Sequence, residues 1–277
     1  MKRQISWLIC ISITSAVVSG QDLSTSLSMA ETNLGEGRYQ DAEMLYRRVL
    51  FFDSSYRYQA ETIRGLATIS FRNQKFDESS KYYLTLSRIT NEPSYYYAHI
   101  LSLLKDENWV LAKRSALNMQ DTSLHVSVSK DIFLALASFG LGDFETSSSF
   151  LDKAEEKLGV EVDQKDIFDQ VGRVDKKSRT KAIVMSAIVP GSGQLYSKHY
   201  GEAANSFLLI SAVGLVYYYS LTQIGFLDAL ISVSPWLNKY YVGGMNRAAE
   251  LVDIYKSEEF LLLYNNVVDL YGKHIRW

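Results

Sequence analysis

A short phrase recurs four times in the first half of this chain: an aromatic residue, two residues of any type, and then a small residue. The four copies begin at Tyr39, Phe76, Trp109 and Phe144. Successive aromatic residues are therefore 37, 33 and 35 positions apart (39 to 76, 76 to 109 and 109 to 144). A period of about 34 residues is the length of one helix-turn-helix unit in a solenoid, and such arrays bind other molecules more often than they catalyse reactions. The repeat therefore predicts an all-α scaffold or adaptor.

The residues on either side of each aromatic residue fit paired helices. Nine positions upstream, three copies carry a small residue and the third copy carries isoleucine: Ala30, Ala67, Ile100 and Ala135. Seven positions downstream stand Tyr46, Tyr83, Ala116 and Leu151. A helix pair must bury a stripe of residues with a period of 3.6, so we expect these positions and the aromatic residues to form the core.

Two copies, Gly37-x-Tyr39-x-x-Ala42 and Gly142-x-Phe144-x-x-Ser147, resemble the tetratricopeptide-repeat family, whose pattern has glycine two positions before an aromatic residue and a small residue three positions after it. The second and third copies carry Gln74 and Glu107 in place of the glycine. The resemblance covers roughly half of the chain and implies about four repeats over residues 21–159. Such arrays bind protein or peptide partners on the concave face, which the first helix of each pair lines. By register, that face is expected to display Glu61, Arg64, Thr68, Phe71, Tyr97 and Leu101.

The N-terminus has the pattern of an export signal over residues 1–20. Lys2 and Arg3 precede an apolar run from Ile5 to Val18, and small residues follow at a suitable cleavage site. An uncleaved anchor helix and a buried first helix are the alternatives. Cys10, the chain's one cysteine, lies inside this run, so the mature protein would have no disulfide or thiolate site. The pattern predicts an exported, membrane-associated protein of the periplasm or cell envelope.

A basic segment separates the repeats from the apolar C-terminal part, and we expect residues 160–181 to be a linker. Its cations are Arg173, Lys176, Lys177, Arg179 and Lys181. A solvated linker is one interpretation, and contact with anionic lipid headgroups is the other. The net charge of the whole chain is −2, which argues against nucleic acid as a partner.

A glycine-containing motif begins the C-terminal domain, residues 182–277. Its defining residues are Pro190, Gly191, Gly193, Gln194, Tyr196 and Gly201. We expect one helix to end at Pro190, a tight turn to follow, and a second helix to begin near Gly201. No strand precedes the glycines, so a nucleotide-binding loop is not expected. The phrase resembles the Pro-Gly-x-Gly-Gln-x-Tyr motif of small membrane-associated helical-hairpin domains, which also follows repeats in uncharacterised exported proteins of Gram-negative bacteria.

The segment after this motif is long and apolar enough to raise the question of a membrane span. Ala203–Leu221 contains 19 residues without a charge, whereas Ile224–Leu237 is shorter and contains Asp228 and Pro235. Export of the repeats would place the basic segment outside, which conflicts with the usual orientation of spanning helices. A spanning hairpin, a surface-bound hairpin and a soluble helical core therefore all stay open. Residues 242–277 are expected to form two short amphipathic packing helices.

No set of residues in the chain predicts catalysis. The four histidines are His99, His125, His199 and His274. None has the spacing of a metal site, so neither a metal nor another cofactor is expected, and the chain is not expected to be an enzyme. The leading hypothesis is a scaffold that binds a protein or peptide and is tethered to membrane lipid. Alternatives are a structural subunit whose repeats act as a spacer, or an envelope enzyme.

Overall fold

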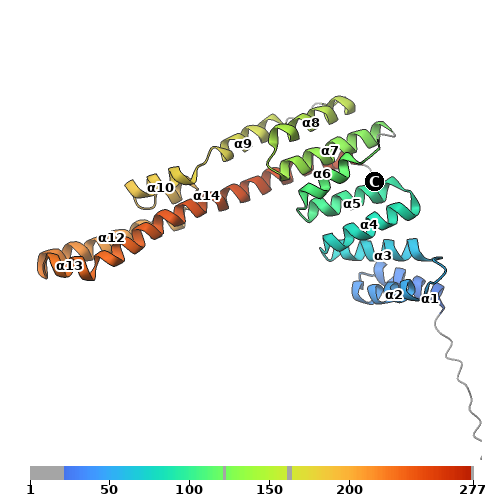
Figure 1. Cartoon of the computed structure of the whole chain (residues 1–277), viewed down its shortest axis with the longest axis horizontal. Coiled ribbons are helices and arrows are strands. Elements are labelled where there is room, and N and C mark those ends of the chain that lie inside the picture. The colour runs from blue at the N-terminus through green and yellow to red at the C-terminus, as the bar shows by residue number, and fades with distance from the viewer. Residues whose placement is uncertain (1–21, 121–122, 161–163, 276–277) are drawn as a thin grey trace, which may run out of the picture. The chain divides into compact units, whose positions relative to one another are not determined.

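The structure is a computed structural model, and it describes residues 22–120, 123–160 and 164–275. Over these ranges the chain forms α-helices and one short 3-10 turn, with no strand, so the prediction of an all-α fold with repeated helix packing is confirmed (Figure 1). The predicted signal peptide, residues 1–20, lies outside the described residues. The chain divides into two compact units, residues 1–106 and 107–277.

The first unit consists of consecutive helices, each of which packs against the next. They are α1 (Leu23–Gly35), α2 (Tyr39–Phe52), α3 (Gln59–Arg72), α4 (Phe76–Thr90) and α5 (Pro93–Lys105). Tyr46 of α2 is buried, and its ring lies so close to Gly65 of α3 that a side chain at position 65 would collide with it. The glycine therefore allows α2 and α3 to approach closely.

Each repeat phrase marks the start of a second helix, immediately after a left-handed turn. The residue two positions before the aromatic residue has a positive φ in all four copies: Gly37 (77°), Gln74 (59°), Glu107 (56°) and Gly142 (76°). In three of these turns, the same two backbone hydrogen bonds close the preceding helix. For Gln74, they are the bond from its N–H to the Phe71 carbonyl and the bond from the Lys75 N–H to the Ser70 carbonyl. This is a Schellman cap, which explains why the family pattern has glycine here.

The small residues of the phrase form the closest contacts within each pair. The Ser79 hydroxyl donates a 3.0 Å hydrogen bond to the Ala67 carbonyl, and the Ser147 hydroxyl donates a 2.9 Å bond to the Ala135 carbonyl. In the first pair, Ala30 and Ala42 share one buried cluster. The predicted core positions at Ala30, Ala67, Ile100 and Ala135 are fully buried, as expected.

The second unit is organised along one long helix, α14 (Ser234–Tyr271), which contacts α7 and each of α9–α13. The other helices are α6 (Trp109–Leu117), α7 (Leu124–Gly140), α8 (Phe144–Leu158), α9 (Lys165–Asp175), α10 (Arg179–Ile188), α11 (Ser192–Tyr196), α12 (Tyr200–Gln223) and α13 (Phe226–Ser232), followed by the 3-10 turn Gly272–His274. In Figure 1, α12, α13 and the first half of α14 lie side by side and form a hairpin.

The glycine motif turns out to build a fifth copy of the repeat turn. Lys198 has φ 62° two positions before Tyr200, and the Lys198 and His199 N–H groups close a Schellman cap on α11. Gly191 and Ala203 occupy the positions of the close pair, and a Cβ at position 191 would come within 2.5 Å of the Ala203 carbonyl oxygen. This copy begins 56 positions after the fourth (144 to 200), and its first helix has only five residues, so the period did not reveal it.

Two sequence expectations about the second unit need correction. Residues 242–277 do not form two short helices, because α14 runs unbroken through Gly243 and Gly244. Gly244 lies against Ser206 of α12, so this glycine serves close packing rather than a break. The segment predicted as a linker, residues 160–181, contains α9 and the start of α10 within its described part.

Candidate functional site

The hairpin of α12, α13 and the first half of α14 carries few charges. Between Ala203 and Asn246, the only charged side chains are Asp228 and Lys239. Of the described helices, α12 alone is long and apolar enough to cross a membrane, with a mean hydropathy of 1.4. At 1.5 Å per residue, its 24 residues span about 36 Å, which exceeds the roughly 30 Å hydrocarbon core of a bilayer.

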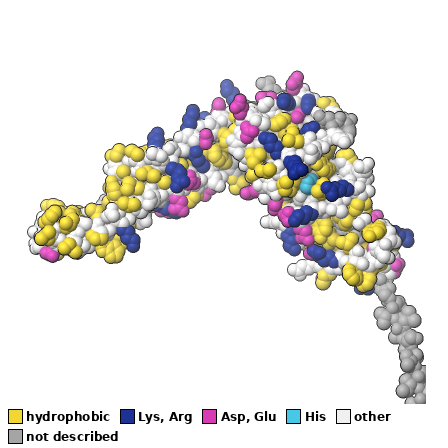
Figure 2. Space-filling view, in the orientation of Figure 1, with side chains coloured by type: hydrophobic (Ala, Val, Ile, Leu, Met, Phe, Trp, Pro, Cys, Tyr) yellow, Lys and Arg dark blue, Asp and Glu magenta, His cyan; other side chains and the backbone are white. Residues whose placement is uncertain are grey.

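The hairpin keeps its apolar side chains on the outside. Only 6% of the apolar window in α12 is buried, whereas a core helix of a soluble protein would be mostly buried. Exposed large side chains follow both arms and the tip: Phe207, Leu208, Leu215, Val216, Tyr218, Tyr219, Phe226, Leu227, Ile231 and Trp236. In Figure 2, hydrophobic side chains cover this end of the second unit, with few charges among them. Exposed apolar surface of this extent indicates an interaction with a membrane or another protein.

An ion-pair cluster marks the base of the hairpin, where its apolar surface begins. Arg247 of α14 lies 2.8 Å from Glu202 of α12 and 2.8 Å from Glu250. Hydrogen bonds that the Arg247 guanidinium donates to Glu202 and, with a smaller effect, to Glu250 raise its pKa above the ordinary value. The cluster joins the two arms at the level where uncharged sequence starts on each of them.

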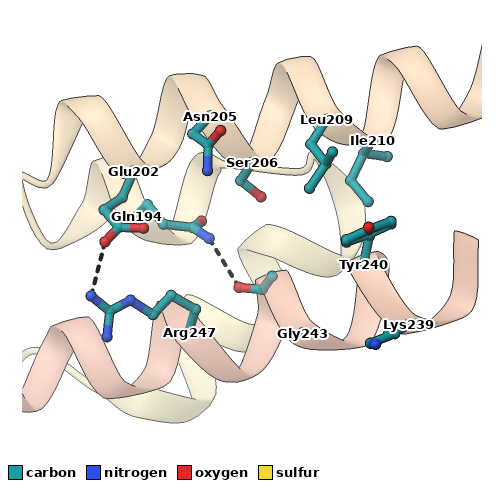
Figure 3. Close-up of a pocket in the computed structure, with 11 residues that line it drawn as sticks. Gln194, Glu202, Asn205, Ser206, Leu209, Ile210, Lys239, Tyr240, Gly243 and Arg247 are labelled. Carbon is teal, nitrogen blue, oxygen red and sulfur yellow. Dashed lines mark hydrogen bonds and ion pairs between the residues drawn. The ribbon is translucent and has the colours of Figure 1, made fainter. Parts of the chain in front are cut away.

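A cleft of about 310 Å³ lies between α12 and α14, and Glu202 and Arg247 of this ion pair are among its lining residues (Figure 3). Asn205 and Ser206 line it from α12, and Tyr240 and the two glycines line it from α14. Gln194 closes its inner wall, and its side-chain amide donates a 2.9 Å hydrogen bond to the Gly244 carbonyl. The cleft therefore carries hydrogen-bonding groups at the edge of an apolar surface.

Gln194 is fully enclosed and ties three helices together. Its side-chain oxygen accepts a 3.0 Å hydrogen bond from Ser186 of α10, and the Ser186 hydroxyl in turn accepts one from the Gly193 N–H. A buried network in which each member has a partner specifies one arrangement of the helices. The glutamine of the motif therefore acts in folding, although the resemblance had only marked it as a family feature.

The other motif residues also serve this junction. A Cβ on Gly193 would collide with the Ala182 carbonyl oxygen and approach the Ala248 methyl group to 2.8 Å, so only glycine fits between α10 and α14. Pro190 follows the end of α10 as predicted, and Gly201 lies exposed in the first turn of α12. Tyr196 is half-buried, and its backbone oxygen accepts a hydrogen bond from the Lys177 ammonium group.

Lys177, one of the predicted membrane-surface residues, is half-buried and lies against aromatic rings. Its Nζ is 4.5 Å from the ring centroid of Tyr196 and 4.5 Å from that of Tyr255, the geometry of a cation–π contact. Burial, followed by the nearby Lys198 charge, lowers the pKa of Lys177. This lysine helps to hold the base of the hairpin domain together.

The remaining predicted basic residues are exposed. Lys176 and Lys181 lie on the surface, and the Lys181 Nζ is 5.2 Å from the Tyr196 ring. Arg179 lies 3.5 Å from Asp253, and Arg173 lies 4.0 Å from Asp166. Exposed pairs of this kind are weak, so these cations keep most of their capacity to attract anions.

The six predicted groove residues divide into two groups in the first unit. Glu61 and Arg64 are exposed on α3, Thr68 and Leu101 are half-exposed, and Arg64 lies 3.8 Å from Glu31. Phe71 instead packs against Phe76 at a centroid distance of 5.3 Å, and Tyr97 is buried. Phe71 nevertheless keeps the same partial exposure as Thr68 and Leu101, so Tyr97 is the one predicted groove residue that is buried.

The described residues contain no group of three or more His, Cys, Asp or Glu side chains that are placed to hold a metal ion. The chain matches no protein-family model, no curated protein and no solved structure.

Proposed function

We propose that this chain is a non-enzymatic scaffold or adaptor of the cell envelope, anchored in a membrane by the α12–α13–α14 hairpin. The observation that supports the anchor is the exposure of the hairpin's apolar side chains along a stretch with only two charges, Asp228 and Lys239. Transfer of such side chains from water to hydrocarbon is favourable by roughly 25 cal/mol per Å² of apolar surface, so insertion has a strong driving force.

The repeats supply the binding part of this proposal. Their resemblance to tetratricopeptide repeats, together with the exposed Glu61 and Arg64 on α3, supports a protein or peptide partner. An anchored repeat array raises the local concentration of its partner at the membrane, which is the mechanism we assign to it. The pattern of residues 1–20 supports export, which would place the array in the periplasm or elsewhere in the cell envelope.

A second candidate function is a structural subunit of a membrane assembly. An apolar groove of about 330 Å³ on the hairpin favours it, and Ala212, Val216 and Trp236 are among its lining residues. Small residues in such a groove allow a helix of another membrane protein to approach closely. In this case the repeats would be a spacer without a ligand.

Membrane fractionation tests the anchor directly. We expect the full chain to stay in the membrane pellet through both a carbonate wash and a high-salt wash. The double variant Leu208→Glu/Leu215→Glu should be released, because two charges on the lipid-facing surface oppose insertion. The matched variant Val110→Glu/Leu117→Glu changes exposed apolar residues of α6 and should stay in the pellet. Release of the unmodified chain by salt, or its complete solubility, would rule out an inserted hairpin.

The substitution Arg64→Glu separates the two candidate functions. An adaptor should lose capture of its crosslinked partner while its membrane retention stays unchanged. A structural subunit should keep the same partners, because its contacts would lie on the hairpin. An unchanged partner set would therefore remove the assignment of α3 as the binding surface.

A further inference from the structure

The second unit contains an aromatic cleft that is separate from the hairpin. Its volume is about 430 Å³, and it opens between α14 and the turns that precede α6 and α8. Five rings line it: Trp109, Phe139, Phe144, Phe260 and Tyr264. Two carboxylates, those of Glu107 and Asp175, complete the lining.

The five rings form one continuous surface. Trp109 contacts Tyr264 at a centroid distance of 5.1 Å, and Tyr264 contacts Phe139 at 6.0 Å. Phe139 contacts Phe144 at 5.0 Å, and Phe144 contacts Phe260 at 5.2 Å. Phe139 is buried beneath Phe144 and Tyr264, and the four rings other than Phe139 are each half-exposed.

Local backbone geometry holds the wall of the cleft in place. Gly140 lies directly against the Trp109 indole, so no other residue at position 140 would leave room for that ring. Glu107 sits in the left-handed turn with φ 56°, two positions before Trp109. The turn fixes the backbone of Glu107 relative to that of Trp109. The site is therefore built before any ligand arrives.

The charge of the cleft is negative. Lys256 forms an ion pair with Asp175, with a distance of 3.4 Å between the ammonium nitrogen and the carboxylate. Glu107 has no ion pair within the described part of the chain and is exposed. Burial raises the pKa of the Tyr264 hydroxyl, and the negative charge of Glu107 raises it further. The Glu107 carboxylate is therefore close enough to influence a charge placed beside the Tyr264 ring.

We propose that this cleft binds an arginine side chain of a partner peptide, with the guanidinium against the rings and paired with Glu107. A guanidinium is planar and weakly hydrated, so it stacks on aromatic faces and forms paired hydrogen bonds with a carboxylate. Cation–π attraction to the rings adds to this pairing. The site deepens the proposed adaptor function by naming the chemistry of its partner, and it does not depend on the hairpin for its geometry.

The test uses the full chain in neutral detergent micelles with 5-fluorotryptophan in place of tryptophan. The probes are acetyl-Gly-Gly-Arg-Gly-Gly-amide and the same peptide with citrulline, a neutral isostere of arginine. The fluorine signal of Trp109, assigned with Trp109→Phe, reports binding. We expect the arginine peptide to shift this signal and to bind at least about 5-fold more tightly than the citrulline peptide.

The carboxylate is tested with a matched pair of variants. Glu107→Gln should weaken binding of the arginine peptide by about 5- to 10-fold and leave the citrulline peptide unaffected. Glu156→Gln, a change of an exposed carboxylate on α8 outside the cleft, should leave both unchanged. Circular dichroism and thermal unfolding of each variant confirm that it is folded.

Three results would overturn the proposal: equal binding of the arginine and citrulline peptides, no effect of Glu107→Gln, or a Trp109 signal that does not respond. Tetramethylammonium that binds as tightly as the arginine peptide would instead indicate a site for small quaternary amines. Membrane retention is measured separately and should be the same for Glu107→Gln and the unmodified chain. A negative result for arginine binding therefore does not contradict the membrane-anchor proposal, and loss of membrane retention would not contradict the arginine site.

Discussion

Gln74 holds a backbone conformation that glycine holds in the first and fourth repeat units. It is exposed, and its φ is 59°. The left-handed region costs a residue with a Cβ about 1 kcal/mol or more relative to glycine. Replacing Gln74 with glycine removes this cost, but glycine also has more conformational freedom in the unfolded chain, which offsets part of the stabilisation. Gln74→Gly should therefore raise the free energy of unfolding of the first unit by about 0.5–1 kcal/mol, as measured by urea denaturation.

A matched change controls for the loss of the glutamine side chain. Gln40→Gly places glycine at an exposed position within α2, where glycine disfavours helix, and should lower the free energy of unfolding. The same response to both substitutions would show that the conformation of residue 74 is not the cause.

His99 provides a prediction about pH. It is buried on α5, and its Nδ1 lies 2.9 Å from the Ser80 hydroxyl. Burial lowers the pKa of His99 below 6.5, although a hydrogen bond to the Ser80 backbone opposes this. The unfolded chain then binds the proton more readily than the folded one, so the free energy of unfolding should fall as pH decreases below about 6.5.

Thermal unfolding between pH 7.5 and 5.5 measures this dependence. His99→Gln should make it flatter, because no proton is then taken up at position 99. His125→Gln, a change of an exposed histidine on α7, should leave it as steep as in the unmodified chain. Equal slopes for the two variants would contradict the assignment to His99.

At the scale of the element, the contact of α10 and α11 with α14 depends on one glycine. A Cβ at position 193 would meet backbone and side-chain atoms of α10 together with Ala248 of α14. Overpacking of this kind costs about 1–3 kcal/mol, and here it would also break the Gly193–Ser186–Gln194 hydrogen-bond network. Gly193→Ala should therefore lower the melting temperature and speed proteolysis between α10 and α12.

Gly201→Ala is the natural control, since nothing lies within 4 Å of a Cβ at that position. Alanine favours helix, so this variant should be as stable as the unmodified chain or slightly more stable. If Gly201→Ala destabilised the domain as much as Gly193→Ala, close packing would not be the reason for the glycine in the motif.

At the scale of the whole molecule, the length of α12 predicts the topology of the anchor. The helix is about 36 Å long, enough to bring the tip that contains Asp228 to the far side of a bilayer. In a Cys10→Ser background, Asp228→Cys and Glu258→Cys should react with a membrane-impermeant maleimide from opposite faces of sealed vesicles. Glu258 lies on α14 beyond the apolar stretch and is exposed.

Reaction of both cysteines from one face, without detergent, would contradict a spanning hairpin. A hairpin on the membrane surface would give that result, and so would a soluble domain. Reaction of the cysteine at position 258 from the cytoplasmic face would place the basic residues inside, in agreement with the usual orientation of spanning helices, and would contradict export of the second unit.

The sequence was sufficient for the features that local patterns encode. The phrase beginning at Phe76 predicted where α4 starts, and Ala67 and Ser79 predicted the close contact between α3 and α4. Both features could be predicted because helical periodicity and left-handed turns depend on residues that are neighbours in the sequence. The same is true of α12, whose run of uncharged residues predicted an exceptionally apolar helix. The residues of the fifth turn, at Lys198, also fit the repeat phrase, but their irregular spacing from the fourth copy kept them from being predicted as a repeat.

Only the tertiary structure determined the environment of residues whose contacts come from helices far away in the sequence. Gly243 and Gly244 looked like a break, yet both lie inside α14, where Ser206 packs against Gly244 and Gln194 donates a hydrogen bond to the Gly244 carbonyl. Lys177 looked like a fully exposed charge, yet it is half-buried against the rings of Tyr196 and Tyr255. Trp109 and Tyr264 are 155 positions apart (109 to 264), and only the folding of α14 onto α7 brings them into one cleft. Helix and turn propensity depend on residues that are neighbours in the sequence. Burial depends on which helices pack together, and the spacing of residues along the sequence does not reveal this.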